Sequence, residues 1–338
     1  MRFAYIITCH KNTEQVLRLV AALNSPDNTI VIHVSTTCEQ GFYESLASEV
    51  AKNKQLLNVF FCKRENGTLA GFGIVKGVIN GLNFLIKNNI SFDYVNLISG
   101  QDYPIKSKEK INDFFKVNIG KQFLYYFPLT PKIYPDYDYD ESWGPDRQQY
   151  RIDRYHFNID NEVLSIPELE SARLIEHSLF STVKIFLYES KKYIKQKRFK
   201  KELGLLFWSR VLPRKRKIPD DFSIFGGITW WSITRDAAIY TLDQHFNNKR
   251  YQNFFRYTLI PDEMYFQTIL LNSPFAKSCV NNDLRDIEWN GGDGTHPIIF
   301  KTEHINRLKE SSDLFARKFD IKVDSNVLDL IDKELLNK

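Results

Sequence analysis

Short apolar segments alternate with amphipathic ones over residues 1–127, and this alternation constrains the fold more than any other feature. In 12–23, apolar side chains recur every three or four positions from Val16 to Leu23, as on one face of a helix. Apolar runs of strand length flank such segments at 3–8, 29–34, 57–61, 94–98 and 122–127. Strands alternating with helices predict an α/β fold, with an open, mostly parallel sheet flanked by helices.

Polar side chains follow several of these strands. His10 and Ser35 come after the first and second strands, and Asp102 comes after the fourth. Ligands of open α/β sheets bind beyond the carboxyl ends of the strands, so we expect a nucleotide-type pocket there. His33 adds a second histidine at this edge. A lone histidine in a sheet usually packs inside it, whereas two beside one crevice favour a ligand contact.

The chain has 338 residues, enough for two domains or one large one. Residues 128–220 are irregular, and within them 131–154 is rich in Tyr, Asp and Arg and too long for a passive connector. Regularity returns over 221–338, where we expect a strand at 228–234 and helices at 235–245 and from Pro261. No repeat or low-complexity linker divides the chain, which favours one composite domain over 1–338.

The charge is distributed unevenly. The net charge is +5, yet 191–217 contains 12 Lys and Arg against the single acid Glu202, so it carries +11 and the remainder −6. Aromatic residues such as Phe207 and Trp208 are interleaved. A solvated basic helical insertion is the plain interpretation, and a surface that lies on anionic lipid is the sharper one. Nucleic acid is disfavoured as a partner because no recognition fold surrounds the segment.

The cysteines and the apolar runs indicate a compartment. The four cysteines show no CxxC spacing, which is typical of reduced, buried thiols. No apolar run reaches the length of about 20 residues that a membrane-spanning helix needs. The opening residues have no basic region followed by a long apolar core, as a signal peptide would. We expect a cytoplasmic protein, with peripheral contact to an inner membrane as the alternative.

Two short segments carry candidate catalytic chemistry. Pro261-Asp262-Glu263 has the proline and acids of an ordinary helix start, and the same carboxylates, ionised at neutral pH, could take a proton from a hydroxyl. Arg317-Lys318 fits the basic end of a helix, and equally a pair of cations that neutralises a diphosphate. Spacing alone leaves both pairs of interpretations open.

A metal site has one sequence candidate. The segment 136–140 reads Asp-Tyr-Asp-Tyr-Asp, and Asp-x-Asp pairs hold Mn²⁺ or Mg²⁺ in many sugar transferases. Such a pair should close the fourth strand, where only Asp102 stands, so a solvated acidic loop is the favoured interpretation. Trp230 lies in an expected strand and Trp289 in a loop, and exposed aromatic faces of this kind can stack on sugar rings.

Several segments together resemble one family. They occur in a single order over almost the whole chain: 6–11, 32–35, SGQDYPIK at 99–106, 230–235, PDE at 261–263, Arg285 with Trp289, His296-Pro297, and LFARKFD at 314–320. The resemblance is to the core-2/I-branching β-1,6-N-acetylglucosaminyltransferases, a family that includes the peptide O-xylosyltransferases. SGQDYPIK and LFARKFD are specific, and the chain resembles a bacterial member.

The resemblance implies a GT-A-type fold and an inverting, metal-independent transfer from a UDP-sugar, with no cofactor. Residues 1–127 would bind the nucleotide sugar, 128–220 would be the insertion, and 221–338 would carry acceptor binding and catalysis. Glu263 matches the family's general base. The implied donor-binding residues are Lys318, Arg317, His33, His10 and Asp102. The implied acceptor-binding residues are Trp289, Trp230 and Arg285.

Two positions depart from the family pattern. Ile298 stands where the family has a second diphosphate-binding arginine, for which Arg317 or Lys301 could substitute, and Ser35 stands where it usually has an aspartate. We expect N-acetylglucosamine to be transferred from its UDP conjugate to a glycan or lipid-linked saccharide. The alternatives are a xylosyltransferase using UDP-xylose and a non-catalytic sugar- or nucleotide-binding homologue.

Overall fold

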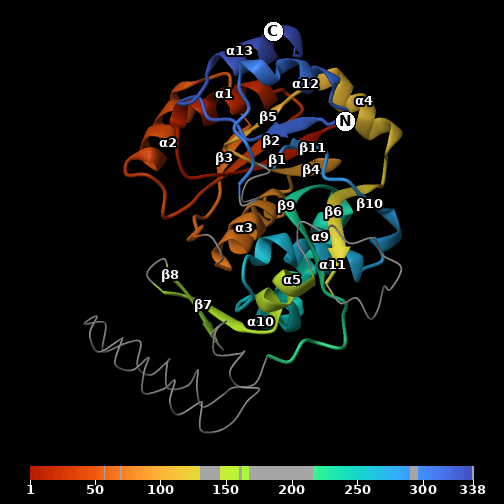
Figure 1. Ribbon diagram of the computed structural model, residues 1–338. Helices are drawn as coiled ribbons and strands as arrows, with labels where there is room; N and C mark the ends of the chain where they lie inside the picture. The colour runs from red at the N-terminus through yellow and green to blue at the C-terminus, as the bar shows by residue number, and fades with distance from the viewer. Residues whose placement is uncertain are drawn as a thin grey trace, which may run out of the picture.

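The computed structural model describes residues 1–56, 58–68, 71–129, 145–159, 162–166, 216–289 and 296–336 (Figure 1). A seven-stranded sheet forms its centre, in the order β10-β6-β9-β4-β1-β2-β3. Its strands are β1 (Phe3–Cys9), β2 (Thr29–Val34), β3 (Val59–Phe61), β4 (Tyr94–Ser99), β6 (Gln122–Pro128), β9 (Phe225–Thr234) and β10 (Cys279–Asn281). Within this sheet β9 runs antiparallel to its neighbours β4 and β6, and the other pairs are parallel. The expected α/β class and mostly parallel sheet are confirmed.

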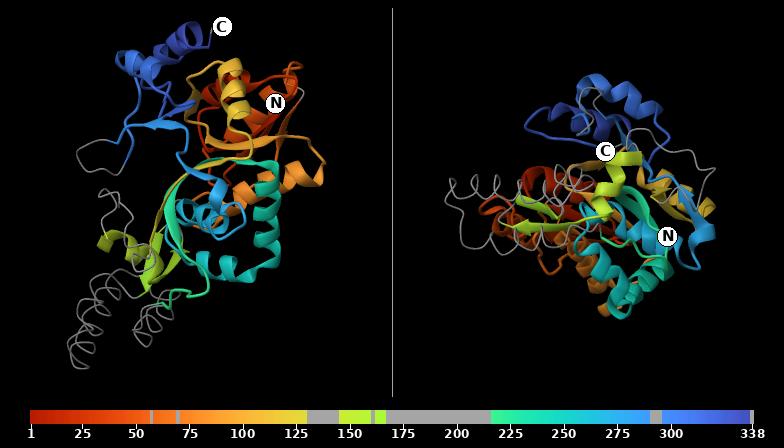
Figure 2. Two further views of the ribbon diagram at one scale, coloured as in Figure 1. Left: turned by 90° about the vertical axis from the view of Figure 1, so that its right-hand side faces the viewer. Right: turned by 60° about the horizontal axis from the view of Figure 1, so that its bottom comes forward.

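Helices cover both faces of the sheet (Figures 1 and 2). Along β1, Tyr5 and Ile7 pack into one apolar cluster, and Ala4 and Ile6 pack into the other, as the alternation of a strand requires. The first face is covered by α1 (Thr13–Leu23), α2 (Phe42–Lys52), α4 (Lys108–Val117), α12 (Ile305–Glu310) and α13 (Asn326–Glu334). A 3₁₀ turn, η4 (Thr302–His304), directly precedes α12. The second is covered by α3 (Gly73–Lys87), α9 (Arg235–Asn247), α10 (Lys249–Phe255) and α11 (Tyr265–Leu271).

Polar side chains fix where the helices begin. Asn12 caps α1 by accepting a hydrogen bond from the backbone N–H of Gln15, at 3.3 Å. Ser107 caps α4 in the same way, and Thr234 caps α9. Each cap satisfies a backbone donor that has no partner within its helix, which sets the boundary between the preceding chain and the helix.

A second, three-stranded sheet, in the order β11-β12-β5, joins distant parts of the chain. It contains β5 (Asp102–Pro104), β11 (Arg285–Ile287) and β12 (Phe315–Arg317). Arg317 is directly opposite Asp102 in the antiparallel pairing of β12 with β5. Arg317 therefore ends a strand, and the helix-end interpretation of Arg317-Lys318 is wrong.

The expected helix from Pro261 is also two elements. A 3₁₀ turn, η2 (Pro261–Glu263), ends at Met264, and α11 follows. The middle of the chain contributes α5 (Pro145–Ile152) and the hairpin of β7 (Tyr155–Ile159) with β8 (Glu162–Ile166). Another 3₁₀ turn, η3 (Ala276–Ser278), precedes β10. Glu263 is thus held in a short turn that follows α10 in sequence and packs against β9 and α11.

Of the basic segment 191–217, the structure describes Arg216 and Lys217, and the Asp-rich 136–140 also lies outside the described residues. Arg216 is buried, donates to Thr258 Oγ1 at 3.1 Å, and stacks 3.9 Å from the centre of the Phe254 ring. Arg216 therefore belongs to the protein interior and is no part of a solvated or lipid-facing surface. No helix in the described ranges is both apolar and long enough to cross a membrane.

Candidate active site

Glu263 lies in η2 and faces a cation from the middle of the chain. Arg151, at the end of α5, places Nη1 2.8 Å from Glu263 Oε2. The side chains are 14% and 20% exposed, so water screens this pair less than it would a surface salt bridge. The 3₁₀ turn and α5, 112 residues apart in sequence, therefore meet at the candidate base.

The surroundings raise the pKa of Glu263 to about 7. Burial is the largest cause, and the neighbouring Asp262 adds to it, while the positive charges of Arg151 and Arg317 lower the pKa. The carboxyl was expected to be fully ionised at neutral pH. With this pKa it is instead about half-ionised at pH 7. A general base works best when its pKa is close to the pH of the reaction, so Glu263 is suited to accept a proton and release it.

Asp262 has a different environment from that of Glu263. Its Oδ2 accepts a hydrogen bond from Thr229 Oγ1 at 2.8 Å, which ties η2 to β9. Its Oδ1 is buried and has no hydrogen-bond partner among the described residues, and burial raises the pKa of this carboxyl. The two acids of the segment thus have different roles: Asp262 anchors the turn to β9, and Glu263 pairs with Arg151.

Arg317 connects Glu263 to the end of the central sheet. Its Nη1 is 3.3 Å from Asp102 Oδ1, and its guanidinium lies 4.3 Å from the centre of the Trp230 ring. Asp102 is buried and accepts two hydrogen bonds from Ser99, at 3.0 Å from the backbone N–H and 2.7 Å from Oγ. Arg317 is therefore placed by an ion pair and a ring contact, although its Nη1 has no hydrogen-bond partner among the described residues, and its charge reaches Glu263.

Lys318 follows Arg317 in sequence and is half-buried. Burial and the charges of Arg317 and Lys11 lower the pKa of its ammonium, and Asp320 raises it. Among the described residues no carboxylate forms an ion pair with Lys318. The exposed His10 is near enough that Lys318 contributes to lowering the pKa of its ring. A cation of this kind is available to an anionic ligand.

Three further predicted residues differ in burial and in their contacts. His33 is buried, and its Nε2 accepts a hydrogen bond from the backbone N–H of Glu65 at 3.0 Å, so its ring holds the chain that follows β3. Arg285 is buried and donates from Nη2 to the Leu97 carbonyl at 2.7 Å. Trp289 is 48% exposed. The part of these three residues in donor or acceptor binding stays a prediction.

The position expected to carry a second arginine lies directly beside Lys318. The backbone N–H of Lys318 donates to the Ile298 carbonyl at 3.4 Å, and the N–H of Phe300 donates to the Lys318 carbonyl at 2.8 Å. Ile298 packs against the apolar core, and Lys301 is exposed at the start of η4. Ile298 thus supplies no charge to this site.

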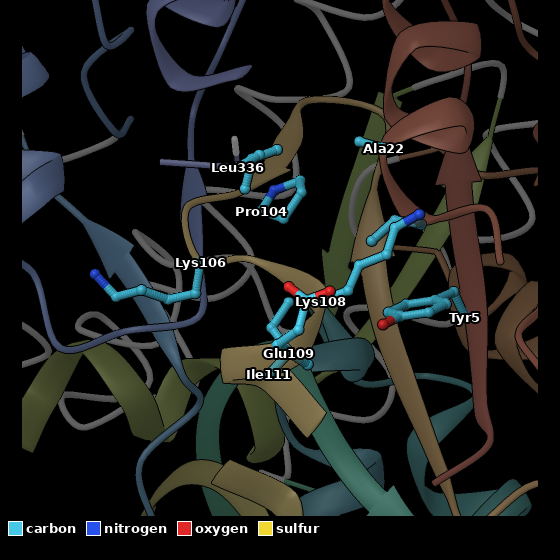
Figure 3. A pocket seen from close by; sticks show the side chains of 9 residues that line it. Tyr5, Ala22, Pro104, Lys106, Lys108, Glu109, Ile111 and Leu336 are labelled. Atoms are coloured by element: carbon cyan, nitrogen blue, oxygen red, sulfur yellow. The ribbon is translucent and has the colours of Figure 1, made fainter. Parts of the chain in front are cut away.

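A cavity of about 150 Å³ lies apart from these groups, between α1, β5, α4 and the end of the chain (Figure 3). Tyr5 forms part of its wall, and Lys106, before α4, and Lys108 and Glu109, at the start of α4, also line it. Neither Glu263 nor Lys318 lines it. The charged groups described above therefore occupy a different place in the fold.

Sequence reasoning missed Arg151, Thr229 and Lys11. Arg151 belongs to the long segment 131–154, whose length was a signal of function, but nothing in the sequence paired it with Glu263.

The described residues hold no group of three or more His, Cys, Asp or Glu side chains arranged to bind a metal. The arrangement offers a carboxylate base beside fixed cations, which suits proton removal from a hydroxyl together with departure of an anion.

Comparison of the sequence with known proteins identifies one family. The profile of the Core-2/I-Branching enzyme family matches residues 3–127 and 171–310. Beta-glucuronosyltransferase GlcAT14A of Arabidopsis thaliana is 24% identical over 348 residues, covering 100% of this chain and 65% of that protein. Xylosyltransferase 2 of Rattus norvegicus is 24% identical over 360 residues, covering 99% of this chain and 34% of that protein.

A shorter match is more similar. Xylosyltransferase 2 of Canis lupus familiaris is 34% identical over 139 residues, which cover 36% of this chain and 16% of that protein. The chain thus spans between a third and two thirds of the length of the relatives that it matches from end to end.

Proposed function

Because the chain belongs to the Core-2/I-Branching enzyme family, we propose that it is a glycosyltransferase that moves a sugar from a UDP-sugar to a hydroxyl of a glycan or lipid-linked saccharide, with inversion at the anomeric carbon. The observation that carries the proposal is the position of Glu263, a mostly buried carboxyl with a pKa of about 7, within reach of the charge of Arg317. Arg317 in turn acts on Lys318, which has no acidic partner among the described residues. A base can remove the proton of the attacking hydroxyl, and the cations can stabilise the departing diphosphate.

In this mechanism Glu263 takes the proton of the acceptor hydroxyl as its oxygen attacks the anomeric carbon. The bond from that carbon to the UDP oxygen breaks in the same step, and the electron pair leaves with UDP. Negative charge then develops on the diphosphate, where the ammonium of Lys318 stabilises it directly and the charge of Arg317, placed beforehand by Asp102, adds to the positive potential. One displacement at one face inverts the configuration.

The proposal includes no metal ion and no cofactor. Fixed cations can neutralise a departing diphosphate as a divalent ion would, and Arg317 is already held by Asp102 and Trp230. Trp289, half-exposed beside the β-bridge to Pro297, offers an aromatic face for an acceptor sugar.

The test replaces Glu263 by Gln and measures both transfer and UDP binding. Transfer should fall by about a thousandfold or more, since the base is lost, while UDP binding stays within about threefold. Glu303→Gln, an exposed acid in η4, is the matched control and should leave both unchanged. Transfer by Glu263→Gln near the wild-type rate would reject Glu263 as the base.

The donor is tested with a panel of UDP-sugars. N-acetylglucosamine is the proposed sugar. Xylose is the second candidate, supported by relatives that bear the name xylosyltransferase, and glucuronic acid is the third, supported in the same way. UDP binding without transfer or hydrolysis of any of these donors would instead identify a non-catalytic sugar- or nucleotide-binding homologue.

We propose further that the enzyme works in a bacterial cytoplasm, at the surface of an anionic inner membrane that the segment 191–217 contacts. Without the buried Arg216 the segment still carries +10, which supports the proposal, since each basic residue near such a surface contributes about 1 kcal/mol. Sedimentation with anionic vesicles but not with neutral ones is expected. Equal binding to both, or binding to neither, would reject the membrane contact.

A further inference from the structure

The Gln15 side chain makes three of the hydrogen bonds that hold the segment after Lys318 against the central sheet. Gln15, in the first turn of α1 and 2% exposed, donates from Nε2 to the carbonyls of Gly100 at 2.9 Å and Phe319 at 3.0 Å. Its Oε1 accepts from the backbone N–H of Ile321 at 3.0 Å. These three hydrogen bonds hold the chain on both sides of residue 320 against the carboxyl ends of β1 and β4, and Lys318 directly precedes the fastened Phe319.

Lys11 reaches the same place from the end of β1. Its Nζ is 2.9 Å from Asp320 Oδ2, and the two side chains are 29% and 10% exposed. An ammonium group has three N–H donors, and Asp320 engages one of them. Two donors of Lys11 are therefore available to a further acceptor, while the ion pair with Asp320 holds the ammonium in position.

The charges around Lys318 are incomplete without an anion. Arg317 is paired with Asp102, and Lys11 with Asp320, whereas Lys318 has no acidic partner among the described residues. The positive charges of Lys11 and Arg317 both lower the pKa of Lys318. The ion pair with Asp320 places the Lys11 ammonium at a residue two positions along the chain from Lys318. An anion that entered between Lys11 and Lys318 would relieve the repulsion between their charges.

We infer that Lys11 and Lys318 form a two-lysine anion site that receives the diphosphate of a nucleoside diphosphate donor, with Lys11 as its second cation. The inference rests on the proposed function, from which the identity of the anion comes. Two ammonium groups act as point charges and suit a flexible diphosphate. Asp320 is a positioning residue that orients Lys11, and Arg317 is already engaged by Asp102 and the Trp230 ring.

Isothermal titration calorimetry with UDP, uridine and inorganic pyrophosphate tests the inference. Lys11→Gln removes the charge but keeps a donor for Asp320, and it should weaken UDP and pyrophosphate binding by about tenfold, as expected for a lost charge-assisted hydrogen bond. Uridine affinity should not change, which also shows that the variant is folded. Lys11→Arg should restore UDP binding to within about threefold.

The matched control is Lys322→Gln, because Lys322 is exposed and two residues from Asp320, so its loss changes the net charge by the same amount. It should leave UDP affinity within about twofold. If Lys11→Gln disrupts folding, Lys11→Met at the same charge replaces it in the comparison. UDP affinity that falls in Lys318→Gln but not in either neutral Lys11 variant would overturn the inference while leaving the proposed function intact. If the wild type binds UDP no better than uridine, the proposed function fails as well.

Discussion

Arg151 donates to Glu263 across 2.8 Å, and this contact joins the middle of the chain to the 3₁₀ turn that carries the candidate base. Burial raises the pKa of Glu263, and Arg151 opposes that rise. The guanidinium therefore has two effects on the carboxylate: it fixes its direction, and it keeps its pKa near neutrality. Both effects can be measured.

Replacing Arg151 by Met should shift the pH–activity profile to higher pH. With the positive charge gone, burial and Asp262 act unopposed by Arg151, so the pKa of Glu263 rises above its value of about 7. Only the ionised carboxylate accepts a proton, so the acidic limb of kcat/KM moves up with that pKa. Below the pKa, activity falls about tenfold for each unit of the shift.

Arg151→Lys is the matched control for this experiment, because it keeps the charge but cannot present the same planar donor. Its profile should remain near that of the wild type at a lower kcat. A profile of Arg151→Met that coincides with the wild-type profile at every pH would show that Arg151 does not act on Glu263.

Glu263 should also make the stability of the protein depend on pH. Its pKa is raised in the folded state, from 4.5 to about 7, so the folded protein binds a proton more tightly than the unfolded chain does. The resulting stabilisation is fully present below about pH 4.5 and is lost as the pH rises through 7. The loss is of the order of 1–3 kcal/mol.

Denaturant unfolding at pH 5 and pH 8 measures this effect. The wild type should lose stability between the two pH values, and Glu263→Gln should lose less, since the amide does not titrate. Equal losses in both proteins would contradict the raised pKa. Glu303→Gln should behave as the wild type does, because Glu303 is exposed.

The central sheet could be predicted from the sequence because its strands and helices differ in local pattern. Residues 94–98 were expected as a strand and form most of β4, and 12–23 was expected as a helix and forms α1 with Asn12 as its cap. Strands of three residues, such as β5 and β12, have no period to detect. They form because their backbones pair across more than 200 residues of sequence, which a local pattern does not contain.

The candidate site divides in the same way. The sequence singled out Glu263, Arg317 and Lys318 as chemistry-bearing residues, and the structure places Arg317 near both of the others. The sequence could not indicate that Arg151 pairs with Glu263, since that contact depends on how 145–152 folds back onto η2. Nor could it separate His33, whose ring nitrogen is already occupied by a backbone N–H, from a ligand-binding histidine.

The position of His33 predicts an intolerant glycine. A Cβ added at Gly77 would lie 2.5 Å from the His33 ring, far inside contact distance, because α3 packs directly on β2 there. Gly77→Ala should destabilise the fold by about 1–3 kcal/mol through overpacking. Gly77→Ala combined with His33→Ala should regain part of that loss when unfolding is followed by denaturant. An unchanged midpoint for the single variant would contradict the packing of His33 against α3.

Transfer activity should persist in excess EDTA. The proposed mechanism stabilises departing UDP with Lys318 and Arg317, whose charges need no added ion, and the described residues show no cluster of acids or histidines suited to a metal. The Asp-rich 136–140 is the remaining sequence candidate, and it lies outside the described residues. Rates measured with EDTA and with added Mn²⁺ should therefore agree within about twofold, and replacing Asp136 and Asp138 together by Asn should not introduce a difference. If transfer strictly required Mn²⁺ and the double substitution abolished this Mn²⁺-dependent transfer, the role proposed for the two cations would belong to a metal site at 136–140.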